Sequence, residues 1–182
     1  MIETIEVPAV DFAECLRRYG VPYYLKIDIE GMDTLCLKAL IPFEERPDYI
    51  SLESDKVSFN KLQEEFNLLI KLGYTKFQTI NQASVPRQKE PEDSREGHFS
   101  GQAFPLGSSG LFGSDLRGEW EDHKQILKKY KRIFLGYELF GDAGRFVRFC
   151  LGRVFLRFLN KYSPEPIPGW YDTHAKHSSV PE

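Results

Sequence analysis

The chain has 182 residues, of which 41% are apolar and 28% charged, and its net charge is −3 at pH 7. This balance is typical of one globular domain with a proper core. No apolar stretch approaches the roughly 20 residues that span a bilayer, and the opening MIETIEVPAV lacks the features of a secretory leader. Cys15, Cys36 and Cys150 form no disulfide or metal-binding pattern, so we expect core cysteines in the reducing cytoplasm.

Charge is divided unevenly along the chain. Residues 120–162 carry ten Lys and Arg against four Asp and Glu, a net +6, so the remainder carries −9. Complementary surfaces within one protein are the commoner explanation, and an anionic partner is the alternative. Because no nucleic-acid-binding fold accompanies the basic part and the isoelectric point is 5.9, we expect no nucleic-acid partner.

The first predicted elements alternate between helix and strand. A short helix is expected over residues 11–19, with Asp11 as its N-cap. Residues 23–29 form a dense apolar run, which favours a central strand covered on both faces, as in a parallel sheet. Gly31 breaks this strand, and residues 32–40 are predicted to be helical.

The same alternation continues through the next segments. Residues 49–53 (YISLE) predict a second strand, and Ser58 is the expected N-cap of a long amphipathic helix over residues 59–73. Residues 74–80 predict a third strand that lies nearer an edge, because apolar and polar residues alternate more strictly there. The opening IETIEV is a further candidate strand. This order predicts an α/β fold with a parallel sheet and right-handed crossovers.

The character of the sequence changes after the third strand. Residues 81–118 are charged and rich in turn-forming residues, and a loop of this length is usually functional or flexible. A basic helix is predicted over 120–134 and a basic amphipathic helix over 145–162. We therefore expect residues 1–140 to form the main domain and residues 141–182 to add a helix and a tail that pack on it.

The helix expected over residues 145–162 sets arginines against many phenylalanines. Its wide apolar stripe favours burial against the domain or at an interface with a partner, with the arginine stems reaching to solvent. Contact with an anionic membrane surface is the second interpretation.

Acidic side chains follow two of the predicted strands. Asp28 and Glu30 flank the end of the first, beside Gly31, and Glu53 ends the second. In α/β sheets, ligands bind outside the carboxyl ends of the strands, and a glycine lets the backbone turn sharply there. The alternative, capping of the helix over 32–40, explains one acid but not the set. Three such carboxylates could hold Mg²⁺, orient a cationic cofactor or supply a general base.

The ordered segments LKIDIEGMDTLCLKAL, PDYISLE and LIKLGYTKFQTIN resemble the FkbM family of S-adenosylmethionine-dependent methyltransferases. Members of this family read K-I-D-V/I-E-G at a strand, followed by a helix and a strand that ends in Glu. The lead-in VDFAECLRRYGVPYY and the later GSSGLFGSDL and WYDTHA also resemble family features. The resemblance implies a Rossmann-like three-layer sandwich with a mostly parallel sheet, and O-methylation of a small-molecule or saccharide hydroxyl.

The resemblance also implies roles for particular residues. Asp28 and Gly31 would contact S-adenosylmethionine, and Asp28, Glu30 and Glu53 are the candidate catalytic residues, with Mg²⁺ as a further cofactor candidate. Family members hold the cofactor in a glycine-rich turn after their first strand, whereas the glycine cluster here, residues 107–113, follows the third predicted strand. The resemblance therefore implies the C-terminal part of such an enzyme, truncated at the N-terminus.

Two other functions remain open. A truncated sheet exposes a strand edge that seeks pairing, so the chain could be a non-catalytic module that binds a partner or a second copy of itself. The carboxylates could instead form a metal site for hydrolysis. His174 is an additional candidate base if Asp172 holds its tautomer, and a tail motif that docks onto the domain is an equal interpretation.

Overall fold

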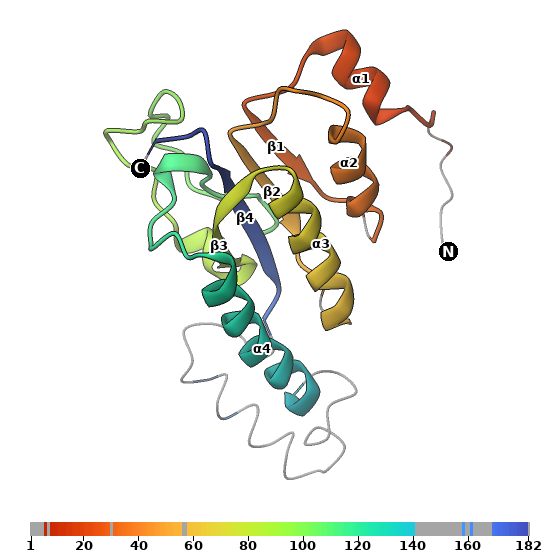
Figure 1. The fold of residues 1–182 in the computed structure, drawn as a ribbon. Helices are drawn as coiled ribbons and strands as arrows, with labels where there is room; N and C mark the ends of the chain where they lie inside the picture. The colour runs from red at the N-terminus through yellow and green to blue at the C-terminus, as the bar shows by residue number, and fades with distance from the viewer. Residues whose placement is uncertain are drawn as a thin grey trace.

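The computed structural model describes residues 6, 8–29, 31–55, 58–140, 158, 161 and 169–181. No helix in this part of the chain is long and apolar enough to cross a membrane. The helix expected over 145–162 and the opening IETIEV fall largely outside the described residues. In chain order, the elements are α1 (Phe12–Tyr19), β1 (Tyr24–Ile27), α2 (Asp33–Leu40), β2 (Tyr49–Glu53), α3 (Phe59–Lys71), β3 (Tyr74–Asn81), the 3-10 turns η1 (Gln82–Arg87) and η2 (Gly113–Asp115), α4 (His123–Phe140) and β4 (Tyr171–His177) (Figure 1).

The described strands form one mixed sheet in the order β1-β2-β4-β3. β1 and β2 are parallel, whereas β4 is antiparallel to both of its neighbours, β2 and β3. The three strands predicted from the sequence therefore share one direction, and the chain has an α/β fold. The expectation of a mostly parallel sheet is wrong, because β4 separates β2 from β3 and runs the opposite way.

β4 lies in the interior of the sheet, although the sequence assigns residues 171–177 to a C-terminal tail. The strand pairs along its length with β2 on one side and β3 on the other. Ala175 and Thr173 are buried on one face, and His174 and Asp172 on the other. Since the polar residues of this strand are buried as completely as the apolar ones, hydropathy did not reveal its position. The part predicted over residues 141–182 thus shares its last strand with the main sheet.

β1 lies at one margin of the described sheet, not at its centre, and β3 lies at the other margin, as expected. Ile27 is buried against the helices, whereas Tyr24, Leu25 and Lys26 are only half-buried. Lys26 is a charged residue within the apolar run, and its side chain lies on the polar face of the sheet. The run is therefore amphipathic, which fits a marginal position.

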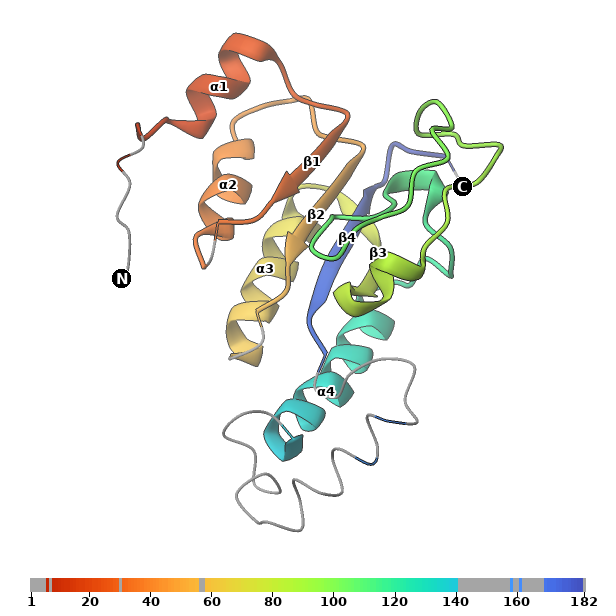
Figure 2. The same cartoon turned by 180° about the vertical axis from the view of Figure 1, so that it is seen from behind.

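The two faces of the sheet are covered differently. α2 and α3 lie on one face, and residues 82–118 cross the other (Figures 1 and 2). The expected three-layer sandwich needs helices on both faces; in the described part of the chain, this long segment occupies the second face instead. The core on the helical face is made of these buried residues: Ile27, Leu37, Leu40, Ile50, Leu52, Leu62, Phe66, Leu69, Phe77, Ile126, Tyr130 and Ala175.

Helix ends form where the sequence places capping residues. The Asp11 carboxylate accepts hydrogen bonds from the backbone N–H groups of Ala13 and Glu14, and Ser58 accepts one from Lys61. Such caps satisfy N–H groups that have no partner within the helix. Both predicted N-caps are confirmed.

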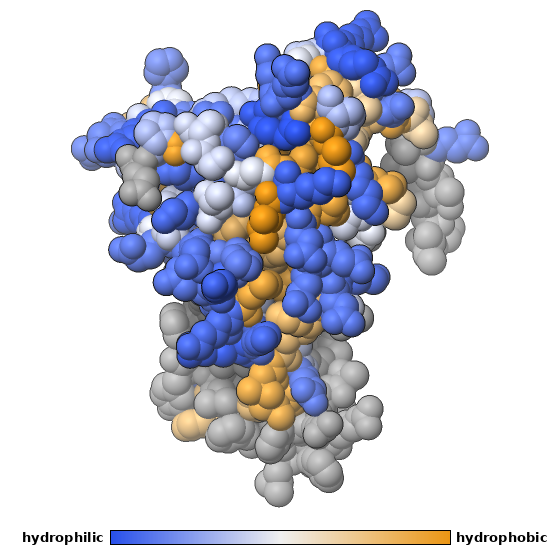
Figure 3. Space-filling model, viewed as in Figure 1, coloured by the Kyte–Doolittle hydropathy of each residue, from blue (hydrophilic) through white to orange (hydrophobic). Residues whose placement is uncertain are grey.

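An aromatic cluster joins α3 and α4 to the sheet. The Phe66 ring lies 5.1 Å from Phe77 of β3 and 5.8 Å from Tyr130 of α4, both in edge-to-face arrangements. These contacts add to the burial of apolar area. Apolar side chains gather in a strip over the helical face (Figure 3). The helices α2, α3 and α4 also carry the exposed apolar residues Leu35, Ile70 and Leu135, respectively.

Residues 82–118 are ordered by their own carboxylates. Asp115 accepts hydrogen bonds from the Ser94 hydroxyl and the Arg95 N–H, and Glu90 accepts from the N–H groups of Ser100 and Gly101. Burial opposes ionisation of Asp115, but the hydrogen bonds that its carboxylate accepts outweigh this effect and hold its pKa below the ordinary value. The segment is therefore a structured cover over one face of the sheet.

Replacing Phe66 with alanine should destabilise the fold by about 3–5 kcal/mol, because it removes a buried ring and leaves a cavity between α3, α4 and β3. The matched change Phe99→Ala, at a half-exposed ring in the 82–118 segment, should cost less than about 1 kcal/mol. Urea unfolding of both variants measures the difference. Similar losses in the two would contradict the position given to Phe66.

Candidate functional site

A row of polar side chains crosses the sheet on the face opposite the helices. The strand register aligns Lys26 of β1 with Ser51 of β2, Ser51 with His174 of β4, and His174 with Gln78 of β3. Residues paired across neighbouring strands point to the same face. Ser51, His174 and Gln78 are buried, so this row lies beneath the 82–118 segment and not in open solvent.

An ion pair links β1 to β4 across the intervening strand β2. The Lys26 ammonium nitrogen lies 2.5 Å from Oδ2 of Asp172, whose side chain is 3% exposed. The same nitrogen is 3.8 Å from Oδ2 of Asp28. Lys26 therefore lies between a buried carboxylate and an exposed one at the carboxyl end of β1.

The charges of two predicted acids, Asp28 and Glu53, both act on Asp172. Burial raises its pKa above the ordinary value, the negative charges of Asp28 and Glu53 raise it further, and Lys26 opposes them. Glu53 is also its partner in the strand register. Asp28 and Glu53, predicted from two separate strand ends, are thus brought together around Asp172.

The turn after β1 leaves open space at the candidate site. Gly31 has a φ of +82°, and, its two chain neighbours aside, a Cβ at this position would meet no atom of the described residues within 4 Å. The left-handed backbone favours glycine, as the sequence predicts. Glu30, the third predicted catalytic residue, lies outside the described residues.

Asp28 does not act as the cap of α2, which was the alternative role for this acid. The N-cap of α2 is Met32, without a side-chain hydrogen bond. Asp33, in the first turn, instead accepts a hydrogen bond of 3.3 Å from the Ile29 N–H. Since Asp33 supplies the negative charge that favours a helix N-terminus, the carboxylate of Asp28 remains available at the site.

His174 is buried in the middle of the polar row. Burial lowers its pKa to about 3, and the nearby Lys26 contributes in the same direction. Its Nε2 atom has no hydrogen-bond partner among the described residues. Oδ2 of Asp172 bonds to Lys26, and no Asp172–His174 hydrogen bond is found in the described part of the chain. His174 is thus neutral at physiological pH. It is a poor candidate for the general base, because its lowered pKa makes it a weak base and its side chain is buried.

Aromatic contacts fix the cover over this face. Tyr24 stacks on Phe112 with ring centroids 4.2 Å apart, and its hydroxyl lies 2.6 Å from the Ser51 hydroxyl. The Tyr49 hydroxyl lies 3.0 Å from the hydroxyl of Ser114. These contacts exclude water from the deeper part of the row, which strengthens the electrostatic interactions there.

A second acidic group lies near the same strand ends, on the helical face. Burial raises the pKa of Glu65 of α3 to about 8, and the charges of Asp55, Asp33 and Glu53 add to this shift. Oε2 of Glu65 has no hydrogen-bond partner among the described residues. The described residues nevertheless contain no group of three or more His, Cys, Asp or Glu side chains placed to hold a metal ion. The predicted Mg²⁺ site therefore gains no support from this part of the chain.

Lys26 was not among the predicted site residues, and Asp172 was predicted only as a partner of His174, not as a member of the acidic group at the strand ends. Lys26 carries a recognisable signal, because a lysine within an apolar strand needs a buried partner. Asp172 carries none that locates it at this edge, since its place depends on the insertion of β4 between β2 and β3.

Comparison of the chain with known protein families, with curated proteins and with solved structures finds no match.

Replacing Lys26 with methionine should lower the free energy of unfolding by about 3 kcal/mol, because it leaves the buried Asp172 carboxylate without its counter-charge. The matched change Lys129→Met breaks the exposed pair with Glu121 and should cost less than about 1 kcal/mol. Chemical denaturation at pH 7 compares them. A loss for Lys26→Met no larger than that of Lys129→Met would rule out a structural role for the pair.

Glu65 should make the protein less stable as the pH rises. Its carboxyl binds a proton up to about pH 8 in the folded state, against an ordinary pKa of 4.5, so the folded state holds more protons between these values. Stability then falls through this window as the pH rises. Glu65→Gln should match the wild type near pH 5 and exceed it above pH 8.

Melting temperatures measured from pH 5 to pH 9 test this difference. Glu64→Gln is the matched control, because Glu64 is the exposed neighbour on the same helix. Parallel pH profiles for the wild type and Glu65→Gln would show that the carboxyl of Glu65 titrates normally.

Proposed function

We propose that the chain takes part in S-adenosylmethionine-dependent methyl transfer to a hydroxyl group of a small molecule or saccharide. The observation that carries this proposal is the meeting of Asp28 and Glu53 around the Lys26–Asp172 pair at the carboxyl edge of the sheet. Ligands of α/β sheets bind at this edge. The methyltransferase class and the preference for oxygen come from the resemblance to the FkbM family.

The residues at the end of β1 fit a cationic cofactor. The Asp28 side chain is 56% exposed, and beyond the two neighbours of Gly31 in the chain no described atom lies within 4 Å of its Cβ position, which leaves room for a ligand beside this backbone. An exposed carboxylate can accept hydrogen bonds from amino and hydroxyl groups and can attract a positive charge. S-adenosylmethionine, when bound, supplies a methyl group on a positively charged sulfur.

Proton removal from the acceptor is the other requirement of O-methylation. Asp172 is the strongest candidate for this step, because its carboxylate has a raised pKa and lies beside Lys26 at the same edge. Glu53, its neighbour in the register, would orient the acceptor hydroxyl in this proposal. Asp28, the predicted catalytic residue nearest the cofactor position, would then bind and orient rather than take the proton.

We also place this activity in the cytoplasm. Cys15 and Cys36 are free thiols in the structure, which is typical of a reducing compartment.

Asp28→Ala should weaken binding of S-adenosylmethionine at least about tenfold, the effect of losing one charged hydrogen bond. The melting temperature should change little, because this side chain is exposed and does not cap α2. Isothermal titration calorimetry with the cofactor measures the first effect. Asp48→Ala, beside the opposite end of β2, is the matched control and should leave the affinity unchanged.

If the wild type binds S-adenosylmethionine and Asp28→Ala binds it equally well, Asp28 is not part of the cofactor site. The absence of any binding by the wild-type chain would overturn the cofactor assignment itself.

A binding module without catalysis is the second candidate. The specific observation in its favour is the edge of β1, which has no further strand beside it among the described residues.

A further inference from the structure

The outer edge of β1 presents backbone groups that no described strand pairs. Within the described sheet, β1 pairs with β2 only, and Figure 2 shows it at the border of the sheet. Such an edge binds another strand unless charge or shape prevents it. Lys26 does not prevent it, because Asp28 at the same edge carries the opposite charge, so a second copy can offer each charge an opposite one.

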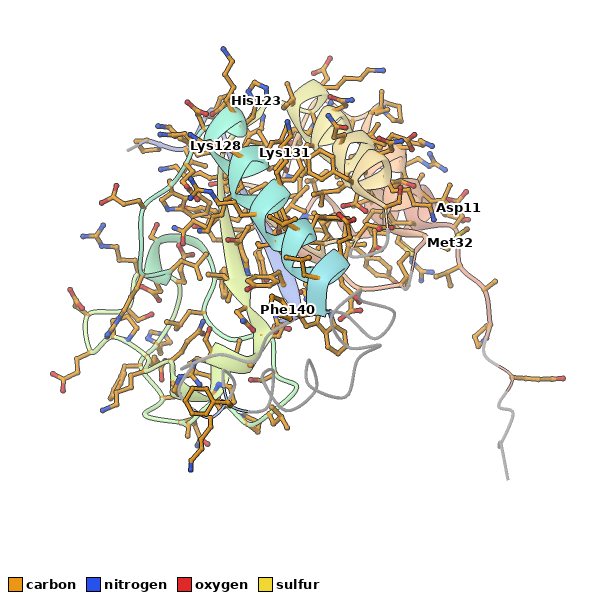
Figure 4. The ribbon with its side chains drawn as sticks, turned by 90° about the horizontal axis from the view of Figure 1, so that it is seen from below. Asp11, Met32, His123, Lys128, Lys131 and Phe140 are labelled. Atoms are coloured by element: carbon orange, nitrogen blue, oxygen red, sulfur yellow. The ribbon has the colours of Figure 1, made fainter. Side chains whose placement is uncertain are left out.

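Apolar side chains continue this edge beyond the strand. Ile29 after β1, Met32 before α2 and Leu35 within α2 are each about half exposed. Figure 4 places Met32 at the side of the molecule away from Lys128 of α4. An apolar margin next to an unpaired strand edge is typical of an interface.

We propose that two copies of the chain pair through β1, in antiparallel orientation about a two-fold axis that passes through Ile27. The pairing joins the two sheets into one and keeps the helices of both copies on the same face. It requires the strand to extend from Leu25 to Ile29, two residues past the observed end of β1.

Charge complementarity selects this register. With Ile27 opposite Ile27 of the second copy, Lys26 faces Asp28 twice, on the polar face of the sheet. On the helical face, Leu25 faces the half-exposed Ile29 twice. Opposite charges directly across an antiparallel pair are stabilising, and apolar pairs bury area, so both faces favour this alignment.

The neighbouring registers that keep the helices on one face are less favourable. Shifting the axis to Lys26 places two ammonium groups opposite each other, and shifting it to Asp28 opposes two carboxylates. Like charges directly across a strand pair are destabilising. Each of these like-charge pairs lies on the two-fold axis and occurs once, whereas the favourable Lys26–Asp28 contact of the Ile27 register lies off the axis and occurs twice.

Sedimentation velocity of the full chain over a range of concentrations tests the proposal. We expect the mass to rise from that of one chain, 21.1 kDa, to that of two. Ile29→Asp should raise the dissociation constant at least about tenfold, because it buries a charge only in the dimer. Its melting temperature should equal that of the wild type at concentrations where both proteins are monomeric. The matched control Leu106→Asp, at an exposed residue of the 82–118 segment, should leave the association unchanged.

Asp28 variants test the register. Asp28→Lys should weaken the dimer because it opposes Lys26 of the second copy, whereas Asp28→Glu should preserve it. A chain that stays monomeric, or a dimer that resists both Ile29→Asp and Asp28→Lys, would overturn the proposal. So would a monomer that dimerises only after removal of residues 1–7, since those residues would then occupy the edge. The readout is mass, so its failure is distinct from failure of methyl transfer.

Discussion

The pairing of Lys26 with Asp172 is the interaction on which the polar face of this protein depends. The two residues belong to β1 and β4 and reach across β2, so one ion pair fixes three strands. A carboxylate buried without a counter-charge is costly, and here the strand nearest the end of the chain carries it. The same ammonium group also faces Asp28, which connects the interior of the sheet to the exposed acid at its edge.

The two faces of the sheet differ in the side chains that they carry. The helical face carries the apolar core and the aromatic cluster of Phe66, Phe77 and Tyr130. The opposite face carries the buried polar row, and residues 82–118 cover it through contacts such as Tyr24 with Phe112. Burial and neighbouring charges shift the pKa values of the titratable groups on this face. Titratable groups with shifted pKa values are typical of functional sites.

Local patterns predicted most of the individual elements. The caps at Asp11 and Ser58, the bounds of β2 and the glycine turn at Gly31 follow from interactions within a few residues. The order of the strands does not, because it depends on a segment about 90 residues beyond β3. The segment YDTHAKH lacks the apolar alternation of an exposed strand, since its polar side chains find buried partners only in the assembled sheet.

β4 also determines when the sheet can form during synthesis, because it is far from its partner strands in the sequence. β2 and β3 do not pair with each other; each is bonded to β4, the last of the described elements in chain order. A nascent chain that has been synthesised only as far as α4 therefore lacks the strand that joins β2 to β3. Pairings between distant segments form slowly and leave apolar surface and strand edges exposed meanwhile. The sheet is therefore complete only after β4 has been synthesised, and until then the nascent chain is a candidate for chaperone binding.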